Sequence, residues 1–190
     1  MRWFVRPRPL TLREIGSMRN DNRKWAPLHE GPLSVEGPGA TLTSVCPERQ
    51  TILSGVDVLI AFTSEFGAAV GWPDVTKGES YSIALRRDRV LLINWPARED
   101  GWDVKNRWAV SDMTGGYACF DLSGSHAMDV LKRGTEIALA EPSRSAARLF
   151  AGLDVVLYRH EKDDTFRFHV NRAQSDAFVL IVRSFLDQMR

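Results

Sequence analysis

The run from Asp112 to Gly134 constrains the fold most, because it predicts a strand that leads directly into a helix. Apolar residues around Cys119 and Phe120 alternate in the way that suits a strand, and this strand ends near Leu122. Beyond it, Ala127, Val130 and Leu131 recur at spacings of three and four residues, which predicts a helix with one apolar side.

The ends of that helix carry recognisable signals. The hydroxyls of Ser123 and Ser125 are suited to accept hydrogen bonds from the first backbone N–H groups. Lys132 and Arg133 lie where the negative end of the helix dipole favours cations. Gly134 is expected to take the left-handed conformation that ends a helix.

Residues 1–50 read as an extended, basic N-terminal arm, because proline and glycine interrupt every short apolar run there. Arginine and aromatic residues alternate in its first half, and these residue types anchor protein interfaces. We therefore expect the arm to contact a partner protein; a terminus folded back over its own domain is the alternative. The expected contact residues are Trp3, Phe4, Arg6, Arg8 and Trp25.

Residues 51–190 are expected to form one compact domain. The β-branched run Val56–Phe62 predicts a buried strand, and a short helix is expected to start at Thr63. The segments 81–85 and 90–95 alternate on either side of a charged turn and predict a hairpin. The charged residues of 97–108 predict a solvated helix.

The last part of the chain predicts a second hairpin and a final helix. The segments 153–160 and 165–170 alternate, and Asn171 with Gln174 forms a capping-box-like start for the helix that follows. The apolar stripe of this helix is wider than one sheet face needs, which predicts burial on a second side. We expect Phe178 and Phe185 on that stripe to contact a partner.

The predicted elements follow one order twice: strand, helix, hairpin, helix. Strands in hairpins with helices returning to one face predict an α+β layered domain with two such halves. This order argues against a doubly wound nucleotide-binding sheet.

Composition narrows the partners. With 25 basic and 24 acidic residues, the chain has no net field to attract nucleic acid or an anionic membrane. Cys46 and Cys119 are far apart and form no Cys-x-x-Cys pair, so neither a disulfide framework nor a zinc site is expected. The N-terminus lacks the apolar core of a signal peptide, and no apolar run is long enough to span a membrane. A cytoplasmic protein is expected.

A search for catalytic and ligand-binding patterns assigns no catalytic, cofactor-binding or metal-binding residue to this chain. Ser123-Gly-Ser125 lies at a strand-to-helix junction but lacks the glycine spacing of a phosphate-binding loop. Cys119 and His126 do not specify a nucleophile and base, and Cys119 is expected to pack as a small apolar group. His160 and His169 flank one hairpin without an identified third metal ligand.

The run Ala109–Leu139 resembles the gamma subunit of heterotetrameric sarcosine oxidases, most specifically at Leu122-Ser-Gly124 and from Asp129-Val-Leu131 to Gly134. The segments starting at Ser145, Val155 and Phe166 look like the closing part of that family, so the resemblance extends over roughly residues 51–190. The first 50 residues and residues 97–108 depart from the family pattern.

This resemblance implies a domain related to the folate-binding aminomethyltransferase fold and a non-catalytic gamma subunit of an oxidoreductase. It implies alpha, beta and delta partner subunits, chiefly alpha, and places FAD, FMN, NAD, zinc and tetrahydrofolate on those partners. Such an assembly oxidises the N-methyl group of sarcosine, or of a related secondary amine, and passes the one-carbon unit to tetrahydrofolate. The alternatives are a free-standing folate-dependent aminomethyl carrier of the same fold and a binding module whose basic arm contacts RNA.

Overall fold

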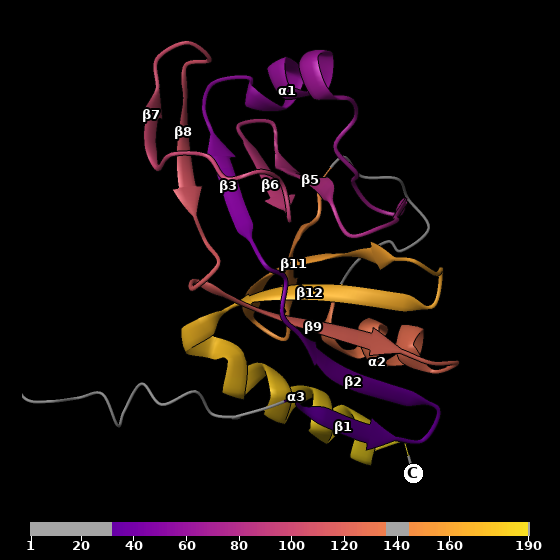
Figure 1. The fold of residues 1–190 in the computed structure, drawn as a ribbon. Helices are drawn as coiled ribbons and strands as arrows, with labels where there is room; N and C mark the ends of the chain where they lie inside the picture. Colours follow the sequence, from indigo (N-terminus) through magenta and orange to yellow (C-terminus); the bar gives the residue numbers. More distant parts are fainter. Residues whose placement is uncertain (1–31, 136–144, 190) are drawn as a thin grey trace, which may run out of the picture. The chain divides into compact units, whose positions relative to one another are not determined.

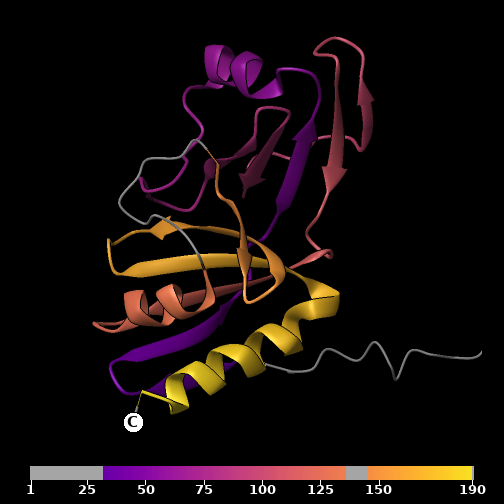
Figure 2. The same cartoon turned by 180° about the vertical axis from the view of Figure 1, so that it is seen from behind.

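The computed structural model describes residues 32–135 and 145–189, which form two β-sheets with helices packed on them (Figures 1 and 2). The expected contact residues of the N-terminal arm, Trp3, Phe4, Arg6, Arg8 and Trp25, lie outside the described residues. The helices are α1 (Val58–Phe66), α2 (Ala127–Gly134) and α3 (Ser175–Asp187), and a 3-10 turn, η2 (Arg172–Gln174), precedes α3. The mixed α/β class with antiparallel sheets agrees with the sequence prediction.

Sheet A has seven strands, six of them in the order β1-β2-β9-β12-β11-β10, and β4 pairs with the other end of β11. Every pairing in it is antiparallel except β4 with β11. Its strands are β1 (Ser34–Gly37), β2 (Ala40–Val45), β4 (Val75–Thr76), β9 (Tyr117–Ser123), β10 (Ala147–Phe150), β11 (Leu153–His160) and β12 (Thr165–Asn171). The predicted second hairpin is therefore confirmed as β11 and β12.

Sheet B has five antiparallel strands in the order β5-β6-β3-β8-β7. They are β3 (Gln50–Ser54), β5 (Tyr81–Arg86), β6 (Arg89–Ile93), β7 (Gly101–Asp103) and β8 (Trp108–Asp112). The predicted first hairpin is confirmed as β5 and β6. The backbone of Ala146 links the two sheets, because its N–H donates to Ala84 on β5 and its carbonyl accepts from Leu157 on β11.

Side chains alternate across sheet A and give it two different faces. On β12, Phe166, Phe168 and Val170 point to the core under α2 and α3, and so do Leu122 on β9 and Leu157 on β11. The residues between them on the same strands face sheet B, where Tyr81, Ile83 and Leu91 meet Val156 and Tyr158. Sheet A is thus covered on both faces by the chain itself.

The region before residue 50 differs from the prediction of an extended arm without regular elements. Residues 34–37 and 40–45 form β1 and β2, and β2 pairs with β9 from Thr41↔Ser123 to Val45↔Cys119. Prolines flank these strands but do not interrupt them. The partner strand lies about eighty residues further along the chain, so local sequence gives no sign of the pairing.

The predicted strand Val56–Phe62 is wrong, because this run forms most of helix α1. Only Val58 and Phe62, four residues apart, are buried on the sheet, as a helix with one covered side requires. α1 ends at Gly67, which has a positive φ. The helix predicted to begin at Thr63 therefore corresponds only to the last residues of α1.

The predicted helix over 97–108 is also wrong, because the segment forms β7, a turn and the start of β8. Gly101 and Arg107 have positive φ, which a right-handed helix does not accommodate. The Asp103 carboxylate accepts hydrogen bonds from the backbone and side chain of Asn106, and this fixes the turn. The first half of the chain therefore lacks the fourth element of the predicted repeat, whereas the second half has all four.

Helix α2 has the predicted position but different ends. His126 is its N-cap residue and no side chain caps it, so Ser123 and Ser125 do not have the predicted role. Gly134 remains within the helix, with Thr135 extended after it. A Cβ at Gly134 would lie 2.3 Å from the ring of Phe150, so close packing, not left-handed geometry, explains this glycine.

Candidate functional site

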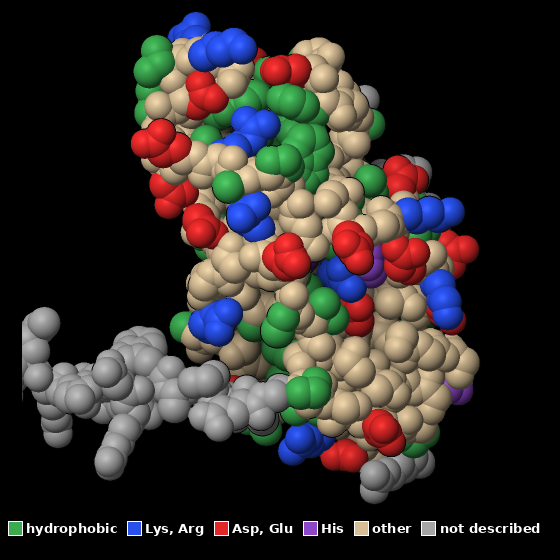
Figure 3. All heavy atoms as spheres, viewed as in Figure 1, with side chains coloured by type: hydrophobic (Ala, Val, Ile, Leu, Met, Phe, Trp, Pro, Cys, Tyr) green, Lys and Arg blue, Asp and Glu red, His purple; other side chains and the backbone are tan. Residues whose placement is uncertain are grey.

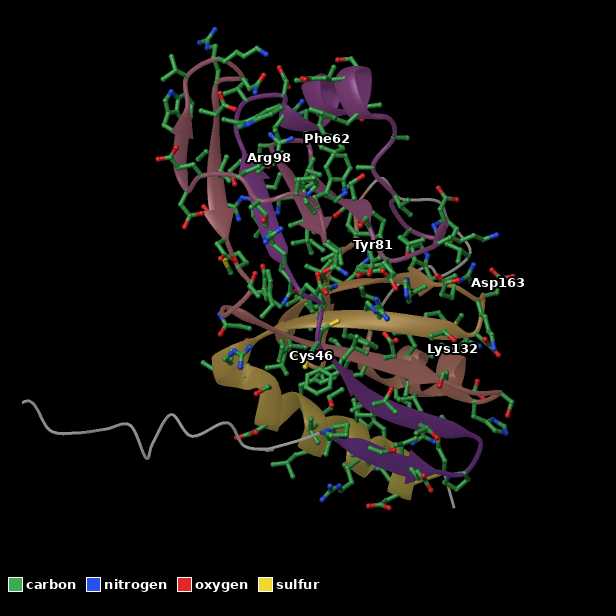
Figure 4. The ribbon with its side chains drawn as sticks, viewed as in Figure 1. Cys46, Phe62, Tyr81, Arg98, Lys132 and Asp163 are labelled. Atoms are coloured by element: carbon green, nitrogen blue, oxygen red, sulfur yellow. The ribbon has the colours of Figure 1, made fainter. Side chains whose placement is uncertain are left out.

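A row of polar side chains lies buried between the two sheets. Alternation on β9, β11 and β12 places it there, because the apolar residues of these strands face α2 and α3 and the residues between them face sheet B. Sheet B contributes one residue at the start of β3 and one at the start of β5. The members are Gln50, Tyr81, Cys119, Asp121, Tyr158, His160, Arg167 and His169, of which Asp121 is partly exposed, and Figure 4 labels Tyr81 among them.

Hydrogen bonds join most of this row into one continuous chain. Arg167 Nη1 donates to Tyr81 Oη over 2.8 Å, and Tyr81 Oη lies 3.0 Å from Tyr158 Oη. Tyr158 Oη is 2.6 Å from His169 Nε2, and His169 Nδ1 is 2.6 Å from Gln50 Oε1. The last hydrogen bond of this series runs from Gln50 Nε2 to the backbone carbonyl of Tyr117 over 3.3 Å.

The donors and acceptors at the two ends of this series, Arg167 and Gln50, together with a neutral His169, set the direction of every hydrogen bond in it. Arg167 can only donate, so the Tyr81 hydroxyl oxygen accepts from it. At the other end Gln50 uses its N–H on a carbonyl, so its oxygen must accept from His169 Nδ1. His169 Nδ1 therefore carries a proton, and in the neutral form of His169 Nε2 accepts from Tyr158, which leaves the Tyr158 oxygen to accept from Tyr81.

Burial and charge hold His169 in this neutral form. Burial, together with the positive charge of Arg167 and the nearby His160, lowers the pKa of His169 to about 3. Burial likewise raises the pKa of Tyr158 well above its usual range, and the neighbouring Tyr81 adds to the shift. Across the neutral pH range His169 therefore does not gain a second proton, and Tyr158 does not lose its hydroxyl proton.

Arg167 and Asp121 form a buried ion pair at the other end of the row. Arg167 Nε and Nη2 each lie 2.7 Å from one Asp121 carboxylate oxygen, a two-point geometry that only a guanidinium provides. Burial would lower the pKa of Arg167, but the hydrogen bonds and charge of Asp121 outweigh burial and raise it. The pair comes from neighbouring strands, because Arg167 on β12 is in register with Asp121 on β9.

His160 lies at the edge of this row and opens towards a cleft. Thr76 Oγ1 donates to the carbonyl of Arg159, so it accepts from His160 Nδ1 over 2.9 Å. This leaves His160 Nε2 with its lone pair free of any hydrogen-bond partner among the described residues. A cleft of about 430 Å³ adjoins His160 and Arg167 and is rimmed by Glu48, Glu79 and Glu161.

The features of the buried polar row favour a structural role over a catalytic one. Burial raises the pKa of the Cys119 thiol, so it stays protonated, and its sulfur is 3.9 Å from His169 Nε2, which already accepts from Tyr158. Cys119 is buried, as expected of a small packed group, and it lies near His169 and not His126. Among residues 32–135 and 145–189, no three His, Cys, Asp or Glu side chains are grouped to hold a metal ion.

Sequence reasoning did not find this polar row. Its signal is present: Arg167 and His169 alternate with Phe166, Phe168 and Val170, so polar and apolar residues take opposite faces of β12. Alternation of this kind usually marks a face in water. The cover provided by sheet B brings Gln50 to His169 across 119 residues of sequence, and no local pattern reveals that contact.

The two expected contact residues on α3 have different environments. Phe178 is fully buried in the chain's own core, with ring centroids 5.0–5.5 Å from Phe120, Phe150 and Phe168, so its prediction as a partner contact is wrong. Most of the α3 stripe is covered by the chain itself, since β1 packs on the helix and Leu186 lies against Gly37, whereas Leu180 stays exposed. Phe185 is half-buried beside Phe150, and its partner contact stays a prediction.

Exposed large apolar side chains gather instead on sheet B, as Figure 3 shows for the end that carries α1. Beside them, Phe62, Phe66 and Trp95 form a small aromatic group, and the Arg98 guanidinium lies 5.4 Å from the centre of the Phe66 ring. Figure 4 labels Phe62 and Arg98 at this end. The exposed residues on and around α1 and β7 are Val56, Ile60, Phe66, Trp102 and Val104.

The sequence matches no protein-family profile and no curated protein. Its structure is similar to a chain of the heterotetrameric sarcosine oxidase from Corynebacterium sp. U-96, solved in complex with pyrrole 2-carboxylate. The likeness is one of fold. The two chains share 17% identity with a TM-score of 0.58, over 81% of this chain and 87% of that one.

None of the helices in the described ranges is long and apolar enough to cross a membrane.

Proposed function

We propose that this chain is a non-catalytic subunit, of the gamma type, in a cytoplasmic heterotetrameric flavoenzyme of the sarcosine oxidase kind. The observation that carries the proposal is the likeness in fold to a chain of such an enzyme. Because the alignment covers similar shares of both chains, 81% and 87%, the matched chain is of nearly the same length as this one. This supports equivalence to one small subunit and not to part of a large one.

The surface of sheet B supports a partner of substantial size. α1 is a short helix of mostly apolar composition, yet only two of its residues, Val58 and Phe62, are buried. A helix that is apolar on several sides is normally covered on those sides. Val56 and Ile60 are 90% and 64% exposed, so α1 and the neighbouring β7 are the surface that a partner subunit would cover.

The chemistry of the proposed assembly belongs to its other subunits. Oxidative demethylation of sarcosine, or of a related secondary or N-methyl amine, would take place on the alpha and beta partners, with delta completing the complex. FAD, FMN, NAD, zinc and tetrahydrofolate would be held there, and tetrahydrofolate would receive the one-carbon unit. The continuous hydrogen bonds that run from Arg167 through Tyr158 and His169 to Gln50 support a scaffolding role for this chain.

Co-expression of the full chain with candidate alpha, beta and delta subunits from the same genome tests the proposal. A tag on this chain should retain all four polypeptides through size-exclusion chromatography, and the purified complex should consume oxygen when sarcosine or a related N-methyl amine is added. A chain that elutes alone in the presence of its partners would contradict it. Saturable binding of tetrahydrofolate to the isolated chain would instead favour the free-standing carrier.

A further inference from the structure

The cleft beside His160 has the features of a small binding site. Two side chains in its wall, His160 and Arg167, are each only 8% exposed, so the site is built into the fold and is not a surface depression alone. Its volume, about 430 Å³, lies within the usual range for small-molecule sites. Ile93 and Val45 supply apolar wall.

The charges around the cleft favour a cation. Arg167 is the one basic residue in the lining, and its charge is already balanced by the two-point ion pair with Asp121. Glu48, Glu79 and Glu161 are exposed at the rim, and none of them makes an ion pair with another described residue. The rim therefore carries three carboxylates without a close ion pair, of which Glu161 also accepts from the backbone N–H of Gly78.

His160 provides an independent sign that something binds there. Its Nδ1 proton goes to Thr76, so the opposite nitrogen, Nε2, is an acceptor without a partner in the described part of the chain. This nitrogen is not among the buried side-chain atoms that lack a partner in the described part of the chain, and His160 forms part of the cleft wall. An acceptor in the wall of a cleft that is also lined by carboxylates matches an N–H donor that is positively charged.

We propose that this cleft binds a protonated organic amine, which donates a hydrogen bond to His160 Nε2 and pairs with the carboxylates of Glu48, Glu79 and Glu161. The alkyl part of the amine would lie against Ile93 and Val45. The same chemistry is offered by a free small amine and by a lysine side chain of a partner subunit. The site is independent of the subunit role, because the isolated chain contains all of it.

Nuclear magnetic resonance of the 15N-labelled full chain tests the site with n-butylammonium chloride as the probe. Butyrate serves as the matched anion, and His160→Gln assigns the His160 signal. The amine should shift the His160 Nε2 resonance saturably, with a Kd on the order of 1–10 mM, as one hydrogen bond and partly exposed ion pairs would give. No saturable shift, or a shift with butyrate only, would overturn the proposal.

Charge-removing variants give the second readout. The triple variant E48Q/E79Q/E161Q should weaken butylammonium binding by at least about threefold, because each exposed pair contributes roughly a 1.4- to fivefold effect. Glu36→Gln, at an exposed position on β1, is the control and should bind as the unaltered chain does. Equal binding of butylammonium by the triple variant and the control would overturn the proposal.

Repeating the titration on the assembled complex distinguishes a free small amine from a lysine side chain of a partner subunit. Binding that persists there identifies a free small amine, whereas binding lost on assembly identifies a basic side chain of the partner. If no complex forms, the subunit proposal fails, while the titration of the isolated chain still decides whether the cleft binds amines.

Discussion

Sheet A and sheet B bury their apolar surfaces to different extents. Sheet A has α2 and α3 on one face and sheet B on the other, and its core includes four mutually packed phenylalanines from β9, β10, β12 and α3. Within residues 32–135 and 145–189, only the short helix α1 lies on the outer face of sheet B, and five of the seven exposed large apolar residues lie on or beside α1 and β7. The described part of the chain thus covers both faces of sheet A but only part of the outer face of sheet B.

The largest effect is expected from opening the core of sheet A. Phe178→Ala removes a fully buried ring that packs on Phe120, Phe150 and Phe168, and it should lower the free energy of unfolding by about 3–5 kcal/mol. Leu180→Ala, two residues away on the same helix but 62% exposed, is the control and should change it by less than about 0.5 kcal/mol. Urea denaturation of both variants measures the difference. Similar losses would mean that sheet A is not the self-sufficient part.

The junction between the sheets should make stability depend on pH. His169 has a folded-state pKa of about 3 and an unfolded value near 6.5, so the unfolded chain binds the proton more tightly. The contribution is complete above pH 6.5 and is lost as pH falls from 6.5 towards 3. Between pH 7.5 and 5 we expect a loss of about 2 kcal/mol from this group.

Chemical denaturation at the two pH values measures this loss in the unaltered chain and in His169→Gln. The substitution leaves His160 and the carboxylates in place, so the difference between the two pH slopes isolates His169. The variant should show a shallower decline towards acid. Equal slopes would mean that the imidazole is charged in the folded chain, contrary to its donors and acceptors.

The sequence predicted those parts of the fold whose signals are local. The two hairpins, the strand-to-helix unit ending at Gly134 and the final helix follow from alternation, turn residues and helical spacing within short windows. Asn171 caps the 3-10 turn η2 and not α3, because its side chain accepts from the backbone of Ala173, whereas α3 begins after Gln174 without a side-chain cap. Sheet A could be read in outline because most of its strands lie in such units.

The errors concentrate where distant contacts decide the structure. Val56–Phe62 is a short apolar run, which strands and buried helices share, and only its position on sheet B selects the helix. β1 and β2 depend on pairing with β9, and the polar row depends on the cover from sheet B. The partner surface was placed on Phe178 because the width of an apolar stripe does not reveal that β1 covers it.

A smaller effect is expected from breaking the hydrogen-bonded chain between the sheets. Tyr158→Phe leaves His169 Nε2 without its donor and Tyr81 without its acceptor, which should cost about 1–2 kcal/mol of unfolding free energy. Tyr117→Phe is the matched control, because the Tyr117 hydroxyl makes no hydrogen bond to the described residues and should change stability by less than about 0.5 kcal/mol. Thermal or urea unfolding compares them. Equivalent stabilities would show that the junction is held by apolar packing alone.

The smallest effect on the isolated chain, and the sharpest test of the comparison, concerns the uncovered side of sheet B. Ile60→Asp on α1 and Leu180→Asp on α3 alter side chains of almost equal exposure, 64% and 62%, so both should change the stability of the chain alone by less than about 0.5 kcal/mol. If a partner covers α1, only Ile60→Asp buries a charge on assembly and should weaken it at least about tenfold, or about 1.4 kcal/mol. Quantitative co-purification of the two variants with the partner subunits measures this. Should Leu180→Asp disrupt assembly and Ile60→Asp leave it intact, the partner would lie on sheet A, and the exposed apolar residues of sheet B would need another explanation.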